Sequence, residues 1–192
     1  AFVSDYVRFD VLYKYGGIYF DVDVEVIKSL DDIINKGPFM GCESKIIGIS
    51  ISDVLKGNFK TKKLVSIAPG LGLGVIPGHE LYKTVLDSYH SSHFVNREYK
   101  SYTVVQRITD ILKEKGFDEF LQNKVQNVCS VNIYPCEYFS PIDLTTRTLK
   151  ITENTRTIHH YAASWLPATA RLPRKIICFF ANVLGKRIGY TV

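Results

Sequence analysis

Two aspartates, Asp21 and Asp23, lie in the apolar segment 16–25 and could hold a metal ion. The segment predicts a strand, in which alternate residues share a face, so both carboxylates should lie side by side. The residues expected on the opposite, buried face are Ile18, Phe20, Val22 and Val24. Neighbouring anions repel unless a cation separates them, and Mg²⁺ or Mn²⁺ prefers carboxylate and phosphate oxygens. The alternative is a solvated turn; an EF-hand loop is excluded because Val26 stands where that loop needs glycine.

A helix over residues 4–15 is predicted just before this pair. Ser4 is a suitable N-cap, and Gly16 is placed to end the helix. Apolar residues recur at helical spacing at Val7, Val11, Leu12 and Tyr15. The acidic pair would then emerge near the end of the strand that follows, where open α/β sheets bind their ligands.

These residues resemble the DXD-containing sugar-transferase family of yeast mannosyltransferases and bacterial capsular-polysaccharide transferases. The glucosyltransferase domain of large clostridial toxins carries a similar block. The matching positions are Ser4, Asp5, Arg8, Leu12, Tyr13, Gly16, Gly17, Tyr19, Asp21 and Asp23. The segment 154–165, with its His-His and Ser-Trp pairs, is similar to the family's C-terminal signature, and 134–141 to the segment before it. The resemblance covers residues 1–166, although 42–63 has no clear counterpart.

The resemblance implies an α/β fold of the GT-A nucleotide-sugar transferase type, with a mixed central sheet flanked by helices. Family members carry a preceding strand-helix-strand portion that binds part of the nucleotide. Since this chain starts within a helix, we expect the N-terminal part of the fold to be missing from it. The expected organisation is a catalytic domain over 1–166 and a basic amphipathic C-terminal helix or tail over 167–192.

A metal site is the first function that the resemblance assigns. Asp23 is expected to bind the cation directly, and Asp21 to contact ribose or sugar hydroxyls and reach the metal through water. A histidine completes the expected set. His159 and His160 should face opposite sides of a strand, so one enters the site while the other packs. The family pattern favours His160.

Binding of the substrate is the second function that the resemblance assigns. Asp5 and Arg8 lie one turn apart on the predicted helix, and the family pattern makes them contacts to sugar hydroxyls and phosphate. The alternative is an exposed intrahelical ion pair. Tyr19 should line the sugar pocket or serve as a core aromatic. Ser164 and Trp165 should bind the donor, with Trp165 donating its indole N–H to the leaving phosphate or else packing in the core.

The resulting prediction is a metal-dependent glycosyltransferase that uses a UDP- or GDP-sugar and Mn²⁺ or Mg²⁺. The resemblance implies retention of anomeric configuration and a role in capsular or other cell-surface polysaccharide synthesis, with a lipid-linked saccharide as the expected acceptor. The alternatives are a metal-dependent nucleotidyl or phosphoryl transferase and an inactive carbohydrate- or membrane-binding module. The glycine-dense segment 68–77 lacks the lysine of a phosphate-binding loop, which argues against the former.

Composition restricts the remaining classes. The 192 residues are 46% hydrophobic and 22% charged with a net charge of +5, which is ordinary globular composition. No nucleic-acid motif accompanies the charge, and no apolar run could span a bilayer. None of the four cysteines forms a Cys-x-x-Cys pair, which disfavours a zinc cluster and fits a reducing compartment. Cys129 and Cys136 are expected to be buried thiols.

The excess of lysine and arginine lies in the tail, where the pattern over 171–188 predicts an amphipathic helix. Such a helix could contact an anionic membrane surface or pack on the domain. We therefore expect a cytoplasmic protein with peripheral contact to the inner face of the membrane.

The rest of the chain predicts alternating helices and strands, which indicates an α/β fold. Short elements are expected within 26–36 and 39–43. Longer helices are expected over 79–94 and 101–115, and strands over 125–138 and 156–161.

Overall fold

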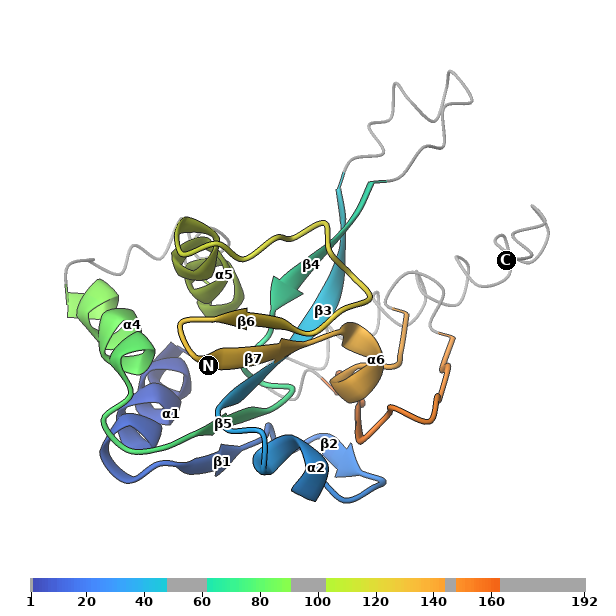
Figure 1. The fold of residues 1–192 in the computed structure, drawn as a ribbon, viewed down its shortest axis with the longest axis horizontal. Coiled ribbons are helices and arrows are strands. Elements are labelled where there is room, and N and C mark those ends of the chain that lie inside the picture. Colours follow the sequence, from blue (N-terminus) through green and yellow to red (C-terminus); the bar gives the residue numbers. More distant parts are fainter. Residues whose placement is uncertain (1, 48–61, 91–102, 144–147, 163–192) are drawn as a thin grey trace, which may run out of the picture.

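The fold is built on one mixed β-sheet with helices on both faces (Figure 1). The computed structural model describes residues 2–47, 62–90, 103–143 and 148–162. In chain order the elements are α1 (Phe2–Tyr15), β1 (Gly17–Tyr19), β2 (Val24–Val26), α2 (Asp31–Ile34), β3 (Phe39–Ile47), β4 (Lys62–Ile67), β5 (Leu73–Val75), α4 (Glu80–His90), α5 (Val104–Glu114), β6 (Gln126–Val128), β7 (Val131–Tyr134), α6 (Cys136–Phe139) and β8 (Thr157–His159).

Strand β3 organises the main sheet, in which the strand order is β1-β5-β3-β7-β6 and β4 also pairs with β3. Its pairing with β7 is parallel, whereas its pairings with β4 and β5 are antiparallel. Strands β2 and β8 form a separate antiparallel pair. The prediction of an α/β fold with a mixed sheet flanked by helices is therefore confirmed, and the GT-A type stays a prediction.

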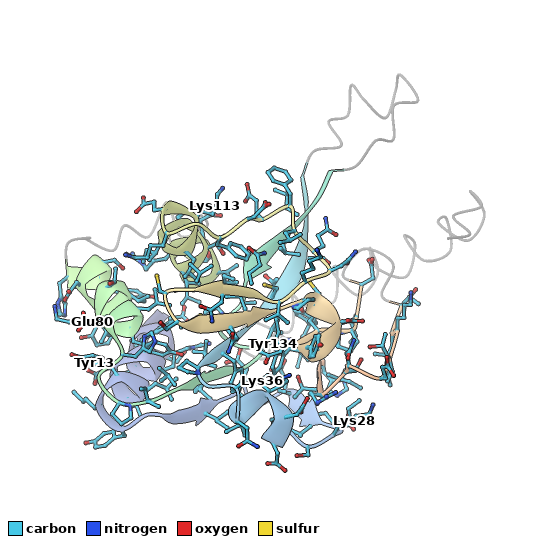
Figure 2. The ribbon with its side chains drawn as sticks, in the orientation of Figure 1. Tyr13, Lys28, Lys36, Glu80, Lys113 and Tyr134 are labelled. Atoms are coloured by element: carbon cyan, nitrogen blue, oxygen red, sulfur yellow. The ribbon has the colours of Figure 1, made fainter. Side chains whose placement is uncertain are left out.

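Two buried clusters cover the two faces of the sheet. Successive strand residues point to opposite faces, so Met40 joins one cluster and its neighbour Phe39 joins the other. The first cluster packs the sheet against α1, α4 and α5, and the second packs it against α2 and α6. Tyr134 lies inside the second cluster, whereas Lys28 and Lys113 lie at the rim of the molecule (Figure 2).

Helix α1 matches the predicted helix and ends where expected. Gly16 has φ +67°, donates its N–H to the Leu12 carbonyl at 2.8 Å, and packs so closely on Pro77 that a Cβ would collide. The buried face differs from the apolar spacing, because Val7, Val11 and Tyr15 are exposed. The buried residues are Asp5, Arg8, Phe9 and Leu12. Two charged side chains therefore occupy the inner face of this helix.

The predicted burial of two cysteines is wrong in one case and only partly right in the other. Residues 126–134 form a hairpin whose two turn residues, Cys129 and Ser130, have φ values of 52° and 61°. These values match a type I′ turn, which projects its residues outward, so Cys129 is exposed. Cys136 begins α6 and is half-buried.

Several predictions concern residues that the structure does not describe. Ser164, Trp165 and the tail 167–192 are among them, so the two-domain division stays a prediction. Among the described residues, no helix combines the length and the apolar character needed to cross a bilayer.

Candidate active site

The two aspartates lie in a turn between β1 and β2, so the predicted continuous strand is wrong here. The N–H of Val24 donates to the Asp21 carbonyl at 3.1 Å, which closes the turn. Val22 is 99% exposed at its tip, although the strand prediction buried it. The N–H of Asp21 donates to the Gly70 carbonyl at 2.9 Å. A Cβ on Gly70 would overlap the Asp21 carboxylate, so glycine is needed for this close approach.

Pairing of β2 with β8 brings a histidine to this turn from far along the chain. Val24 pairs with His159, and the N–H of His160 donates to the Asp23 carbonyl at 3.0 Å. The His159 ring then lies with Nε2 at 3.2 Å from Asp23 Oδ1 and 3.9 Å from Asp21 Oδ2. One ligand atom from each of these three side chains falls within 4.8 Å of the others.

His159 is suited to offer Nε2 as a neutral ligand. It is 8% exposed, and burial lowers the pKa of its imidazole, although Asp23 and Asp21 oppose that shift. Its Nδ1 is buried with no hydrogen-bond partner within the described part of the chain. Two carboxylates and a neutral imidazole fit a divalent cation such as Mn²⁺.

The structure places His160 elsewhere, although the family pattern favoured it. Its Nε2 lies 2.9 Å from Glu25 Oε2, and both side chains are more than half exposed. His160 directly follows His159, the last residue of β8, and neighbouring residues of extended backbone face opposite sides, so only one histidine side chain reaches the acidic turn. The geometry favours His159, and the assignment of the ligand stays a proposal.

Asp5 and Arg8 join this cluster from α1. Arg8 Nη2 donates to Asp5 Oδ1 at 2.8 Å, and Nη1 lies 3.3 Å from Asp21 Oδ1. Both residues are less than one-tenth exposed, so the pair differs from the exposed intrahelical alternative. Burial raises the pKa of Asp5, and Arg8 offsets that shift only in part.

Tyr19 connects the same groups through its ring and its hydroxyl. The hydroxyl donates to Asp21 Oδ1 at 2.8 Å, and the Arg8 guanidinium lies 4.6 Å from the ring centroid. Burial, together with the hydrogen bond to Asp21, raises the pKa of Tyr19 to about 12. The phenol therefore stays protonated near neutral pH and acts as a donor.

A cavity of about 130 Å³ opens beside these residues. Its walls come from α1, from the turn that follows β1, from β3, from the segment 68–71, from the start of α5 and from the end of β8. The lining residues are Asp5, Arg8, Asp21, Glu43, Ala68, Gly70, Leu71, Val104, Val105, His159 and Tyr161. Two converging hydrogen-bonding groups, Glu43 and Tyr161, were not predicted from the sequence. Two sequence features could have identified them. Glu43 alternates with Phe39 in the predicted strand 39–43, and Tyr161 directly follows the histidine pair.

The arrangement therefore unites five of the predicted site residues, which are Asp5, Arg8, Tyr19, Asp21 and Asp23. It adds His159 in place of His160, and it leaves Ser164 and Trp165 outside the described residues. Chemically, it combines acceptors for a hard cation with a buried guanidinium that can bind phosphate or hydroxyl oxygens.

Comparison with known proteins supports the resemblance over the first part of the chain. No curated protein and no solved structure matches the chain significantly. One family does match, over α1, β1, the acidic turn, β2, α2 and the first residues of β3. Residues 1–40, which carry Asp5, Arg8, Asp21 and Asp23, match the family described as the glycosyltransferase sugar-binding region containing DXD motif.

Proposed function

We propose that this protein is a metal-dependent glycosyltransferase that moves a sugar from a nucleotide-sugar donor to a saccharide acceptor. The observation that carries the proposal is the convergence of Asp21, Asp23 and His159 within 4.8 Å, next to the buried Arg8. The match of residues 1–40 to a glycosyltransferase family supports the same conclusion.

Asp21, Asp23 and His159 would hold Mn²⁺ or Mg²⁺. A divalent cation at this position supplies Lewis-acid stabilisation of the charge that develops on a diphosphate leaving group. The chain prepares the ligands in advance: the N–H of Ala162 donates to Asp23 Oδ2 at 2.8 Å, and Tyr19 holds Asp21 Oδ1. Ligands held in this way need little rearrangement when the cation binds.

Asp5 and Arg8 would orient the sugar. The Arg8 fork is fixed on three sides, by Asp5, by Asp21 and by the Ser4 carbonyl, which accepts from Nε at 3.3 Å. A guanidinium fixed in this way presents its remaining donors in a defined direction. The Asp5 carboxylate can accept hydrogen bonds from sugar hydroxyls.

The finer assignments rest on the family resemblance. We assign retention of configuration, a UDP- or GDP-sugar, and binding of the donor by Ser164 and Trp165. We further propose a lipid-linked saccharide acceptor in capsular or other surface polysaccharide synthesis, and a cytoplasmic location with membrane contact through 171–188.

The test is a screen of UDP- and GDP-sugars for Mn²⁺-dependent hydrolysis and transfer by the complete protein, beside two variants. Asp23→Ala removes a proposed ligand. Asp87→Ala removes an exposed carboxylate of α4 that pairs with Lys83, and serves as the control. We expect turnover of one donor that is lost with EDTA and in Asp23→Ala and kept in Asp87→Ala. Cleavage within the diphosphate would support a nucleotidyl or phosphoryl transferase instead. The absence of both turnover and metal-dependent donor binding would overturn the proposal.

A further inference from the structure

A continuous series of contacts surrounds the cavity and ends at a carboxylate that the proposed chemistry does not yet use. It begins at Asp5, which bonds to Arg8, and continues through Asp21 to His159. The His159 ring then meets the Tyr161 ring edge-on, with centroids 4.2 Å apart. The Tyr161 hydroxyl reaches Glu43 Oε2 at 3.4 Å. All six side chains line the cavity, with the proposed cation site in the middle of the series.

Glu43 is directed to this cavity by its place on β3. Its neighbours in the strand, Cys42 and Ser44, point to the opposite face, where Cys42 belongs to the core that packs against α1, α4 and α5. Glu43 is half-buried and lines the cavity, so solvent solvates its carboxylate only in part.

Tyr161 is held in an unusual conformation that keeps its hydroxyl beside Glu43. Its φ is +51°, in the left-handed region that residues with a Cβ disfavour. The hydroxyl is 2.6 Å from Ser140 Oγ as well as near Glu43. Strained backbone of this kind persists where surrounding contacts determine it, and it is enriched at ligand sites.

We propose that Glu43 is a substrate-binding residue whose carboxylate accepts a hydrogen bond from a sugar hydroxyl, and that Tyr161 positions that carboxylate. The inference rests on the proposed function. A sugar whose diphosphate lies at Asp21, Asp23 and His159 would extend into the cavity between Asp5 at one end of the contact series and Glu43 at the other. Charged acceptors make shorter and stronger bonds to hydroxyls than neutral ones, which gives Glu43 influence over the substrate selected. The hydroxyl belongs either to the donor sugar or to the acceptor.

The test compares Glu43→Gln with Ser44→Ala, the adjacent strand position on the opposite face, in the complete protein with Mn²⁺. Glu43→Gln should reduce kcat/KM about 10- to 100-fold, as expected for loss of a hydrogen bond to a charged group. Binding of the free nucleoside diphosphate with Mn²⁺ should stay within about threefold, because the cation site is intact. Ser44→Ala should stay within about twofold. Tyr161→Phe should lower kcat/KM about 3- to 10-fold.

Deoxy analogues of the substrate provide a readout that a purely structural role would not change. A site that hydrogen-bonds a hydroxyl discriminates against an analogue that lacks it. With the analogue deoxygenated at the contacted position, Glu43→Gln should cost less than about threefold. A loss in donor hydrolysis without acceptor assigns the hydroxyl to the donor sugar, whereas a loss in transfer alone assigns it to the acceptor. Unchanged kinetics in Glu43→Gln, or an equal loss with every analogue, would overturn the inference.

The outcome in which the wild-type protein binds no nucleotide-sugar would overturn the proposed function and needs a different probe. In that case the probes are free monosaccharides, with binding followed by ligand-observed NMR. Binding by wild type that Glu43→Gln weakens about tenfold or more would preserve the sugar contact alone. Absence of monosaccharide binding by wild type would overturn both proposals.

Discussion

Two cavities border β3, one beside Glu43 and one beside Ser44, and the smaller one holds the candidate site. The cavity beside the acidic turn measures about 130 Å³, whereas a second cavity lined by Ser44, Pro135, Cys136 and Glu137 measures about 240 Å³. In the larger cavity the charged side chain is Glu137. Its two carboxylate oxygens accept hydrogen bonds from Thr152 Oγ1 at 3.2 Å and Asn154 Nδ2 at 3.0 Å, which tie α6 to the segment before β8.

The comparison shows that convergence of charge, rather than volume, marks the candidate site. Burial of several ionisable groups against one another costs solvation free energy, so folds rarely accumulate such groups without use. Asp5, Arg8, Asp21 and His159 meet in the smaller cavity, whereas the larger cavity uses its carboxylate to secure a loop. Four predictions test this distinction.

The largest effect is expected for Asp21→Asn, which keeps the shape of the side chain and removes its charge. Asp21 contacts Arg8, Tyr19 and the proposed cation, so the change should lower metal-dependent kcat/KM by about 1,000-fold, equivalent to ~4 kcal/mol of transition-state stabilisation. The measurement is turnover of the donor identified in the screen. Asp87→Asn is the matched control. Activity within tenfold of wild type would show that the smaller cavity is not the reaction site.

The second effect separates the adjacent histidines. His159→Ala should weaken Mn²⁺ binding by at least about tenfold because it removes a proposed ligand, whereas His160→Ala should stay within about twofold because His160 pairs with Glu25 at the surface. Titration of Mn²⁺ by electron paramagnetic resonance measures both. The reverse order would reinstate the family-based choice of His160.

The third effect is a pH dependence with a defined sign. Burial lowers the pKa of His159 below its usual 6.5, so the ring should stay neutral, and able to ligate Mn²⁺, through pH 7 and down to about 6.5. Below the lowered pKa, affinity should fall about tenfold per pH unit, since a proton competes with the metal. The free energy of unfolding of the metal-free protein should depend on pH in the same direction. The unfolded state takes up the His159 proton first as the pH falls. The contribution of His159 to stability is therefore present above pH 6.5 and is lost as the pH falls through its lowered folded-state pKa. Metal titrations in wild type and His160→Ala should agree, and a midpoint above 6.5 would contradict the assignment.

The smallest effect on activity is expected in the larger cavity. Glu137→Gln should lower the free energy of unfolding by ~1 kcal/mol, because a neutral amide oxygen accepts from the Asn154 side chain more weakly than the carboxylate does. Its kcat/KM and Mn²⁺ affinity should stay within about twofold. Denaturant unfolding measures the first quantity and donor turnover the second. A loss of activity as large as that of Asp21→Asn would extend the functional site across β3.

The sequence by itself determined the features that depend on short-range interactions. Helix α1 and its end at Gly16 follow from capping and local steric preference, and the Asp-x-Asp pair stands in the block that a glycosyltransferase family also carries. The α/β class follows from alternating helical and strand patterns. The continuous strand through Val22 was predicted wrongly, because apolar alternation alone cannot reveal that a turn interrupts it.

The tertiary structure alone decided which distant groups meet at the turn. Pairing of Val24 with His159 joins segments 135 residues apart, and its register selects His159 over His160. Burial of Arg8 beside Asp21 and arrival of Glu43 from β3 depend on how α1 and the sheet pack. A shift of one residue in a strand register would reverse every side chain, and no local preference specifies that register. Long-range pairing therefore assembles the site from residues that the sequence could name only in part.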